Sequence, residues 1–278
     1  MSNGSSHPVA KVSISERQYQ FLKRQKHHHF IVKSARLLLL FGFLFLWEVS
    51  SRLGIIDSFI FSSPSKIVLC FWSMILDKSI FTHIGMTLYE TLVSFLLVTI
   101  ISILLSTLLW FSRKLSEISE PFLVVLNSLP KSALAPLLIV WLGATPTTII
   151  VAGMSVAIFG SILNLYTSFM SVEEETLKLI YTLGGKRRHA LMKVVIPGSV
   201  PAIISNMKVN IGLCLVGVVI GEFLAARNGL GYLIIYSSQV FKMDWLLMSI
   251  VILCIMAMAL YSLIAFLEKR LLDRNQFK

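Results

Sequence analysis

Charged residues are scarce in this sequence. Asp, Glu, Lys and Arg make up only 14% of its 278 residues, whereas hydrophobic residues make up 56%. An ordinary soluble domain carries about 25% charged residues. This shortage excludes a typical soluble domain and predicts a chain that places most of its length in lipid.

The longest stretch without an acidic or basic residue runs from residue 132 to residue 172, which is 41 residues. Because one spanning helix needs about 20 apolar residues, this stretch is too long for a single helix. It is interrupted by Gly143-Ala-Thr-Pro146, a sequence typical of a tight turn. We therefore expect two spanning helices joined by a hairpin.

Apolar segments of spanning length recur along the rest of the chain. They predict an all-α, polytopic membrane protein with about six transmembrane helices. The sequence before the first of them has no small-residue cleavage site, so we expect the first helix to be retained. The expected spans are residues 34–53, 83–111, 120–143, 147–170, 197–221 and 245–267.

The basic residues set the expected orientation. In the six-span scheme, 18 of the 25 Lys and Arg residues fall on the side that holds both termini, and five fall on the opposite side. Positively charged loops resist translocation, so both termini are expected in the cytoplasm. Residues 1–33 then form a basic cytoplasmic segment, residues 34–272 the transmembrane domain and residues 273–278 a cytoplasmic tail. The net charge of +11 is mainly a topology signal, and no nucleic-acid binding is expected.

Cysteine is also rare. Cys70, Cys214 and Cys254 lie in or beside apolar segments without paired spacing, and we interpret them as small buried hydrophobes. Residues 27–29 are three consecutive histidines in a basic segment, a placement that suits a solvated membrane surface better than convergence on one ion. No metal site is predicted.

The loop between the first two expected spans, residues 54–82, is too polar to cross the membrane. Within it, residues 64–76 have helical periodicity and begin with a proline, which is favoured in the first helical turn. We expect a short amphipathic helix on the outer surface.

The loop at residues 171–196 carries the strongest local helix signals. Ser171 and Glu174 have the spacing of a capping box, and Gly184-Gly185 supplies a stop. The acidic first turn at residues 173–175 and the basic residues after the stop suit the helix dipole. We predict a helix of about three turns that begins at Ser171.

This predicted helix carries more apolar residues than a cytoplasmic loop needs to stay soluble. Leu177, Ile180 and Tyr181 fall on it. Either the ends of the protein's own helices or a partner should cover them.

Ionisable residues within spans are functional candidates because their burial in lipid is costly. Lys131, in the third span, either faces a pathway or has a structural role such as pairing. Lys208, in the fifth, either faces a pathway or snorkels toward the interface. Glu90 is expected at an interface. Gly217 and Gly221 are four residues apart, which permits close helix crossing.

Several motifs in this chain resemble binding-protein-dependent ABC transporter permeases. The main one is Leu183-Gly-Gly185 followed by Lys-Val-Val-Ile-Pro-Gly-Ser-Val-Pro at residues 193–201. The branch that serves nitrate, sulfonates, taurine and related solutes is the most similar, over about residues 56–272. Further matching motifs are Ser63-Pro-Ser65, Leu129-Pro-Lys-Ser-Ala-Leu-Ala-Pro-Leu137, Trp141-Leu-Gly143 and Gly229-Leu-Gly-Tyr-Leu-Ile234.

The resemblance implies that residues 171–196 form a coupling loop that docks on an ATPase. The family's Glu-Ala-Ala triplet falls on Lys178-Leu179-Ile180, so a glutamate from the preceding turn is expected to substitute. The candidate coupling residues are Glu173, Glu174, Glu175, Leu177, Lys178, Ile180, Tyr181, Gly184 and Gly185.

The resemblance also implies a transporter subunit rather than an enzyme. It would form a pathway for a small solute, a nitrate-, sulfonate- or taurine-like anion or a related organic compound, delivered by an extracytoplasmic binding protein. ABC-type ATPase subunits would hold ATP and Mg, and this chain would bind no cofactor. The implied setting is a homodimer of permease chains in the lipid of a prokaryotic inner membrane.

The chain's own residues agree that the energy comes from elsewhere. Gly184-Gly-Lys186 has Ile180 where a P-loop needs its first glycine, and Arg187 where it needs Ser or Thr. A secondary transporter or channel is the alternative, but six spans without an obvious inverted repeat would leave the docking loop unexplained. A membrane enzyme would need a cluster of catalytic side chains within the spans, and none is evident.

Overall fold

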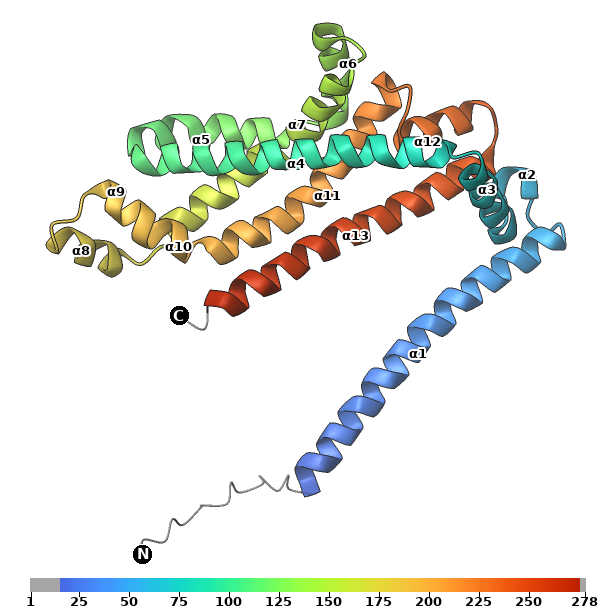
Figure 1. Cartoon of the computed structure of the whole chain (residues 1–278), viewed down its shortest axis with the longest axis horizontal. Helices are drawn as coiled ribbons and strands as arrows, with labels where there is room; N and C mark the ends of the chain where they lie inside the picture. Colours follow the sequence, from blue (N-terminus) through green and yellow to red (C-terminus); the bar gives the residue numbers. More distant parts are fainter. Residues whose placement is uncertain (1–15, 276–278) are drawn as a thin grey trace, which may run out of the picture. The chain divides into compact units, whose positions relative to one another are not determined.

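The computed structural model describes residues 16–275, and every regular element among them is a helix (Figure 1). The expectations for residues 1–15 and 276–278, and for the side chains of residues 27–29, lie outside the described part. The all-α prediction is confirmed. The helices are α1 (Glu16–Arg52), α2 (Ser58–Phe61), α3 (Pro64–Leu76), α4 (Ser79–Phe111), α5 (Arg113–Ser128), α6 (Lys131–Leu142), α7 (Pro146–Met170), α8 (Glu174–Thr182), α9 (Arg187–Ala190), a π-helix (Leu191–Val195), α10 (Ile196–Gly198), α11 (Val200–Ala225), α12 (Leu230–Gln239) and α13 (Met243–Asn275).

The chain divides into two compact units at Pro64. In the first, α1 contains residues 34–52 of the first expected span, and its crossing of the membrane stays a prediction. The turn after α1 is closed locally, because the Ser51 hydroxyl donates a hydrogen bond of 3.1 Å to the Ser62 carbonyl oxygen.

The second unit is built around α7, which packs against both α4 and α11, and these two helices also contact each other. Small polar residues line the first of these contacts. The hydroxyls of Ser94 and Ser106 on α4 donate to the carbonyl oxygens of Ile150 and Ile162 on α7, at 3.0 and 2.9 Å. Such residues let helices approach closely in a membrane, where apolar burial alone gives little preference for protein over lipid.

Glycines make the contact between α7 and α11. A Cβ atom on Gly217 would lie 2.8 Å from the Cα of Gly153 and 2.9 Å from the Ala152 carbonyl oxygen. One turn further on, a Cβ on Gly221 would lie 3.1 Å from the Cα of Ile149. The two helix backbones are therefore closest at this pair of glycines.

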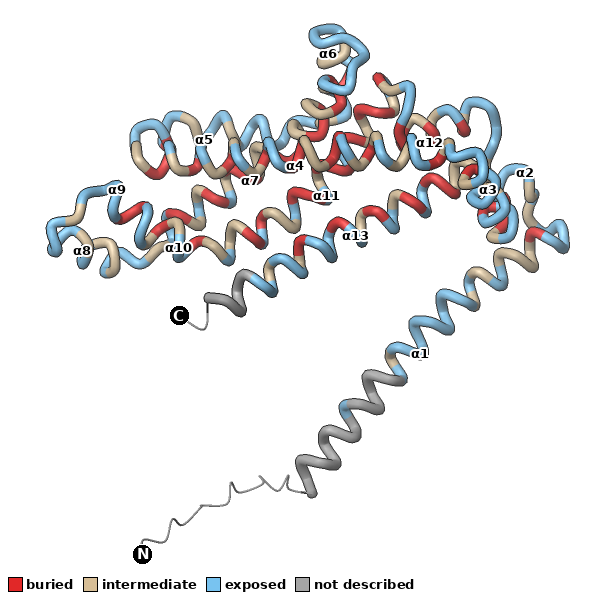
Figure 2. The backbone as a smooth tube through the Cα atoms, in the orientation of Figure 1, coloured by how far each residue is buried: buried red, intermediate tan, exposed pale blue. Residues whose placement is uncertain are grey.

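The last long helix, α13, packs against α11 and α12 along one stripe. Its buried residues recur every four positions, which matches one face of a helix, whereas much of its other surface is exposed and apolar (Figure 2). A helix with this pattern suits a bundle that is surrounded by lipid. The stripe consists of Met248, Ile252, Met256, Leu260 and Ile264.

Among the described residues, α4, α7, α11 and α13 are long and apolar enough to cross a membrane. They contain the expected spans at 83–111, 147–170 and 245–267 and all but the first three residues of the one at 197–221. The expected third span at 120–143 is wrong as a single helix. The chain bends by 97° between α5 and α6, because Pro130 cannot continue the helix and holds Leu129 in an extended conformation. The count of six spans stays a prediction.

The short helix α3 has the bounds that the sequence predicted, and it starts at Pro64. Ile67 and Met74 are its buried residues, whereas Val68, Leu69 and Trp72 are exposed. Its position on the outer surface of the membrane stays a prediction.

Candidate functional site

The loop between α7 and α11 contains α8, but α8 begins later than the sequence indicated. Ser171 ends α7 instead of starting α8: its backbone N–H bonds to the Thr167 carbonyl, and its hydroxyl donates to the Ser168 carbonyl at 2.8 Å. The serine hydroxyl is satisfied in the preceding turn, so the expected capping box does not form. Residue Glu173 occupies the N-cap position of α8 without a side-chain cap.

The apolar residues of α8 and its C-cap differ in exposure. Leu177 and Ile180 are half-buried and pack against the protein's own core cluster. Tyr181 is 44% exposed, and so are Leu179 and Leu183, at 57% and 75%. Of the expected apolar residues, Leu177 and Ile180 are covered by the protein itself, whereas Tyr181 remains uncovered, together with its neighbours Leu179 and Leu183. We call Leu179, Tyr181 and Leu183 the α8 exposed face.

The acidic residues of this loop lie at the surface. Glu173, Glu174 and Glu175 are all exposed, and the Lys178 ammonium pairs with Glu174 at 3.1 Å. An exposed pair four residues apart on a helix contributes about 0.5 kcal/mol or less. These side chains are available to a partner rather than committed to the fold.

Two glycines end α8. Gly184 has φ of +78°, the left-handed conformation that favours glycine at a helix end. The backbone N–H of Gly185 donates to the Ile180 carbonyl oxygen at 2.8 Å, and a Cβ on Gly185 would lie 2.6 Å from that same oxygen. Both positions therefore require glycine, one for its conformation and the other for space.

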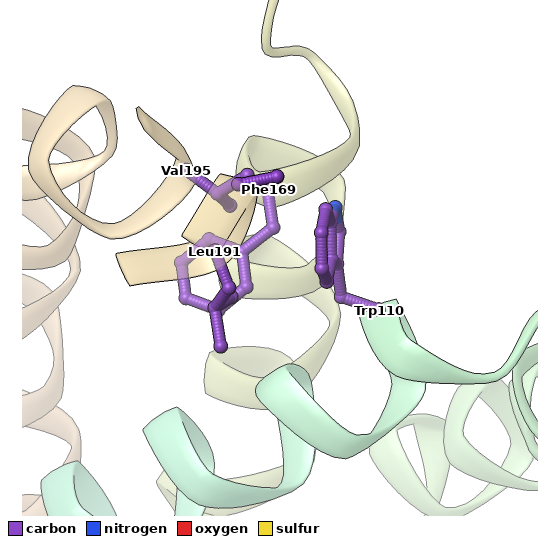
Figure 3. Packing of buried hydrophobic residues seen from close by; sticks show 5 residues of the cluster. Trp110, Phe169, Leu191 and Val195 are labelled. Atoms are coloured by element: carbon purple, nitrogen blue, oxygen red, sulfur yellow. The ribbon is translucent and has the colours of Figure 1, made fainter. Parts of the chain in front are cut away.

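Behind α8, the loop is anchored on the ends of two spanning helices. The cluster contains Trp110 at the end of α4 and Phe169 at the end of α7, with Leu191 and Val195 from the π-helix (Figure 3). The Arg187 side chain donates a hydrogen bond of 2.8 Å to the Trp110 carbonyl oxygen. A displacement of α8 would thus act directly on α4 and α7.

We call this cluster, together with Arg187, the anchor; the sequence did not predict it. The sequence indicated two properties of Arg187, that it suits the helix dipole after the glycine stop and that it does not fit a nucleotide-binding loop, but it indicated no contact with Trp110. The available signal was an aromatic pair at the end of an apolar run, followed by a cationic residue in the loop after α8. The sequence did not indicate that Arg187 and Trp110 are in contact, because the two residues lie 77 positions apart.

Lys131 is the first residue of α6 and lies at the bend, not within a continuous span. Its ammonium group donates to the Leu126 carbonyl oxygen of α5 and lies 5.0 Å from the centre of the Phe159 ring on α7. The carbonyl oxygen is one that the break of the helix leaves free, so the lysine stabilises the bend. No acidic partner of Lys131 occurs among the described residues.

Lys208 has a partner within the chain. Its ammonium group forms an ion pair with Glu268 on α13, and about a fifth of each side chain is exposed. The pair joins α11 to α13.

The structure corrects the position of Glu90. It was expected at an interface but is fully buried on α4, with 0% exposure. A second acid, Glu222 on α11, is 1% exposed and was missed, because the expected span ended one residue before it. Its oxygens accept hydrogen bonds from the Thr87 hydroxyl at 2.6 Å and the Gly231 backbone N–H at 2.7 Å.

Comparison with known proteins decides the family. The family model described as "binding-protein-dependent transport system inner membrane component" matches residues 98–278. This chain belongs to that family. The match includes the C-terminal part of α4 and all of α7, the α8 loop and α11, which contain the cluster behind α8.

Similar proteins include curated permeases and solved transporters. The putative aliphatic sulfonates transport permease protein SsuC of Bacillus subtilis is 26% identical over 84% of this chain and 85% of its own length. The taurine transport system permease protein TauC of Escherichia coli is 23% identical over 70% of this chain and 71% of its own. A chain of the inward-facing MetNI methionine ABC transporter has a TM-score of 0.61 at 17% identity, covering 72% of this chain and 97% of that one.

This permease is therefore an integral, multi-pass membrane protein and a transporter subunit, not an enzyme. Membership of the family implies an ATPase partner and a solute-binding protein partner. Among the described residues, no group of three or more metal-ligating side chains occurs.

Proposed function

We propose that the α8 exposed face is the surface on which the ATPase docks, and that the anchor behind it carries ATP-driven movement to α4 and α7. ATP and Mg bind to the ATPase, and this chain binds no cofactor. The observation behind this proposal is that Leu177 and Ile180 pack on the core, whereas Leu179, Tyr181 and Leu183 remain uncovered.

The outer side has the composition of a docking surface. Leu179, Tyr181 and Leu183 are large and uncovered, and the exposed glutamates of residues 173–175 lie at the N-terminal end of the same helix. An apolar centre with a polar rim is the usual anatomy of a protein interface. In water such a helix would otherwise expose apolar surface without a structural reason.

The inner side supports transmission. Leu177 and Ile180 pack against the cluster that contains Trp110 and Phe169, and these two residues end α4 and α7. Protein interiors are close-packed, so a rigid contact of this kind passes on a displacement instead of absorbing it. Movement of the ATPase would then shift the ends of α4 and α7 together.

The named solutes of the relatives support a proposal for the class of solute. Those with named solutes are permeases for aliphatic sulfonates, taurine, formylaminopyrimidine and riboflavin. We propose that this permease carries a small solute, either a nitrate-, sulfonate- or taurine-like anion or a related small organic compound. The ammonium group of Lys131, which has no acidic partner among the described residues, would supply the cation for such an anion.

The assembly and its location complete the proposal. Two copies of this chain would enclose one pathway, with lipid around them, in the cytoplasmic membrane of a prokaryote. An extracytoplasmic binding protein would deliver the solute at the end of the bundle opposite α8. Exposed apolar residues such as Ile118, Phe122 and Val125 on α5 are available to the second copy or to lipid.

The test replaces the α8 exposed face. Leu179, Tyr181 and Leu183 are changed together to Ser, and the permease is purified with its co-expressed ATPase. We expect the variant to insert normally into the membrane. The amount of ATPase that co-purifies with it should fall at least tenfold. The matched control is Leu115→Ser on α5, an exposed leucine of a different element. Equal recovery of ATPase with both variants would contradict the proposal.

A further inference from the structure

Two acidic side chains meet inside the bundle, at the end opposite α8. Glu90 on α4 is 0% exposed and Glu222 on α11 is 1% exposed. Thr87 lies three residues before Glu90 on α4 and donates a hydrogen bond to Glu222, so both carboxyl groups belong to one buried contact between α4 and α11. Among the described residues, no lysine or arginine forms an ion pair with either of them.

Two adjacent carboxylates without a cation are not a stable arrangement in apolar surroundings. Burial of one unpaired charge costs several kcal/mol, and a second like charge beside it adds repulsion. Carboxyl groups in this position share a proton, so that only one of them is charged. One proton is the smallest ligand that satisfies both groups.

The hydrogen bonds show which carboxyl carries the proton. Glu222 accepts from the Thr87 hydroxyl and from the Gly231 backbone N–H, and both bonds stabilise a charged acceptor. Neither oxygen of Glu90 has a hydrogen-bond donor among the described residues. The neutral acid is therefore assigned to Glu90, and the charge to Glu222.

The backbone before α12 is shaped around the Glu222 carboxyl. Gly229 has φ of +118°, and a Cβ atom added there would collide with the carboxyl group. A Cβ atom on Gly231 would lie 2.7 Å from the Glu222 Oε2 atom. The same loop is tied to α4, because the Leu230 backbone N–H donates to the Thr87 hydroxyl oxygen at 2.8 Å. This close fit is a physical reason for the two glycines of the Gly229-Leu-Gly231 motif.

A small cavity reaches Glu90. Its volume is about 150 Å³, and Glu90 lines it together with residues at the start of α7 and in the loop after α11. Its polar lining includes Thr145, Arg227 and Asn228. A cavity of this size admits several water molecules, each of which takes up about 30 Å³ in the liquid. Water there can bring a proton to Glu90 and remove it.

We propose that Glu90 and Glu222 form a binding site for one exchangeable proton, and that this proton holds α4 against α11 and the loop before α12. Raising the pH removes the proton and leaves two facing carboxylates, which repel each other and loosen this contact. The other titratable groups around the site are His83 on α4, which accepts from the Gly229 N–H at 3.1 Å, Tyr232 on α12, which stacks on His83, and Arg227 at the cavity wall.

Infrared spectroscopy of the purified full-length permease distinguishes a carboxylic acid from a carboxylate. At neutral pH we expect one buried carboxylic acid band, which shifts in heavy water and disappears as the pH is raised. Glu90→Gln should abolish this band. The glutamine amide N–H can donate a hydrogen bond to Glu222, so no titratable proton is needed between the two side chains. Glu222→Gln should keep a shifted acid band from Glu90. The control Glu117→Gln, an exposed acid paired with Arg113, should leave the band unchanged.

The wild-type protein alone can overturn the proposal, whether or not the variants fold. Absence of an acid band at neutral pH would show that both carboxyls are ionised. Loss of the band on addition of sodium at constant pH would show that a metal cation occupies the site instead of a proton. A band that persists in Glu90→Gln would belong to another residue.

Discussion

The guanidinium group of Arg187 lies 5.2 Å from the centre of the Trp110 ring and donates a hydrogen bond of 2.8 Å to the Trp110 carbonyl oxygen. This contact joins the segment that follows α8 to the last turn of α4. The oxygen is at a helix C-terminus, where carbonyl groups have no partner within the helix and a cation is favoured. One side chain thus connects the proposed docking element to a membrane-spanning helix.

Arg187→Gln should uncouple the permease without preventing assembly. The contact combines a charge-assisted hydrogen bond with a cation–π interaction, which together contribute about 1–3 kcal/mol. We expect at least a tenfold loss of transport per ATP hydrolysed in reconstituted vesicles, with normal recovery of the ATPase. Arg188→Gln, in the adjacent position, is the control. Equal coupling in the two variants would show that the contact has no part in transmission.

Gly184→Val should misplace the α8 exposed face through backbone strain alone. An added Cβ at Gly184 meets no atom within 4 Å, so no collision contributes, but φ of +78° costs a β-branched residue about 1–2 kcal/mol. We expect normal membrane insertion with reduced ATPase recovery or reduced solute-stimulated hydrolysis. Gly212→Val on α11 is the control, because space there is also open and φ is ordinary. Unchanged coupling in Gly184→Val would remove the turn from the mechanism.

Lys131→Met and Lys208→Met should give different defects. Lys131 has no acidic partner among the described residues, whereas Lys208 pairs with Glu268. We expect Lys131→Met to lower solute uptake at least tenfold while ATPase assembly remains normal. We expect Lys208→Met to lower the thermal stability in detergent, because it leaves Glu268 unpaired. Uptake of Lys131→Met that equals the wild type at every solute concentration would leave only its role at the bend.

Gly217→Val should disrupt the packing of α7 on α11. The new side chain would start 2.8 Å from the Cα of Gly153, and backbone atoms cannot move aside as a flexible side chain can. We expect a loss of stability of about 3 kcal/mol or failure to fold, measured as thermal unfolding in detergent. Gly85→Val on α4, where an added Cβ meets nothing within 4 Å, should be much milder. Equal unfolding temperatures for the two variants would contradict the packing argument.

The sequence predicted the helical class, the long apolar helices and the bounds of α3, because hydrophobic length and proline position are local signals. The prediction was wrong at Ser171. Its hydroxyl group could bond either to the preceding helix or to the following one, and it bonds to the preceding helix. The prediction also failed at Glu222, since a charged residue after an apolar run has the same local pattern whether it is buried or at an interface. The contacts of Arg187 with Trp110 and of Glu222 with Thr87 depend on packing between distant segments, which no local pattern encodes.

The most direct test of the central claim is thiol labelling of the Tyr181→Cys variant. Its three native cysteines are first replaced, so that only position 181 can react. A membrane-impermeant thiol reagent should not label this cysteine in intact cells, should label it in inverted vesicles stripped of ATPase, and should lose at least tenfold of that labelling when the ATPase is added back. Labelling in intact cells, or labelling that the ATPase does not change, would contradict the account that α8 is the cytoplasmic docking element.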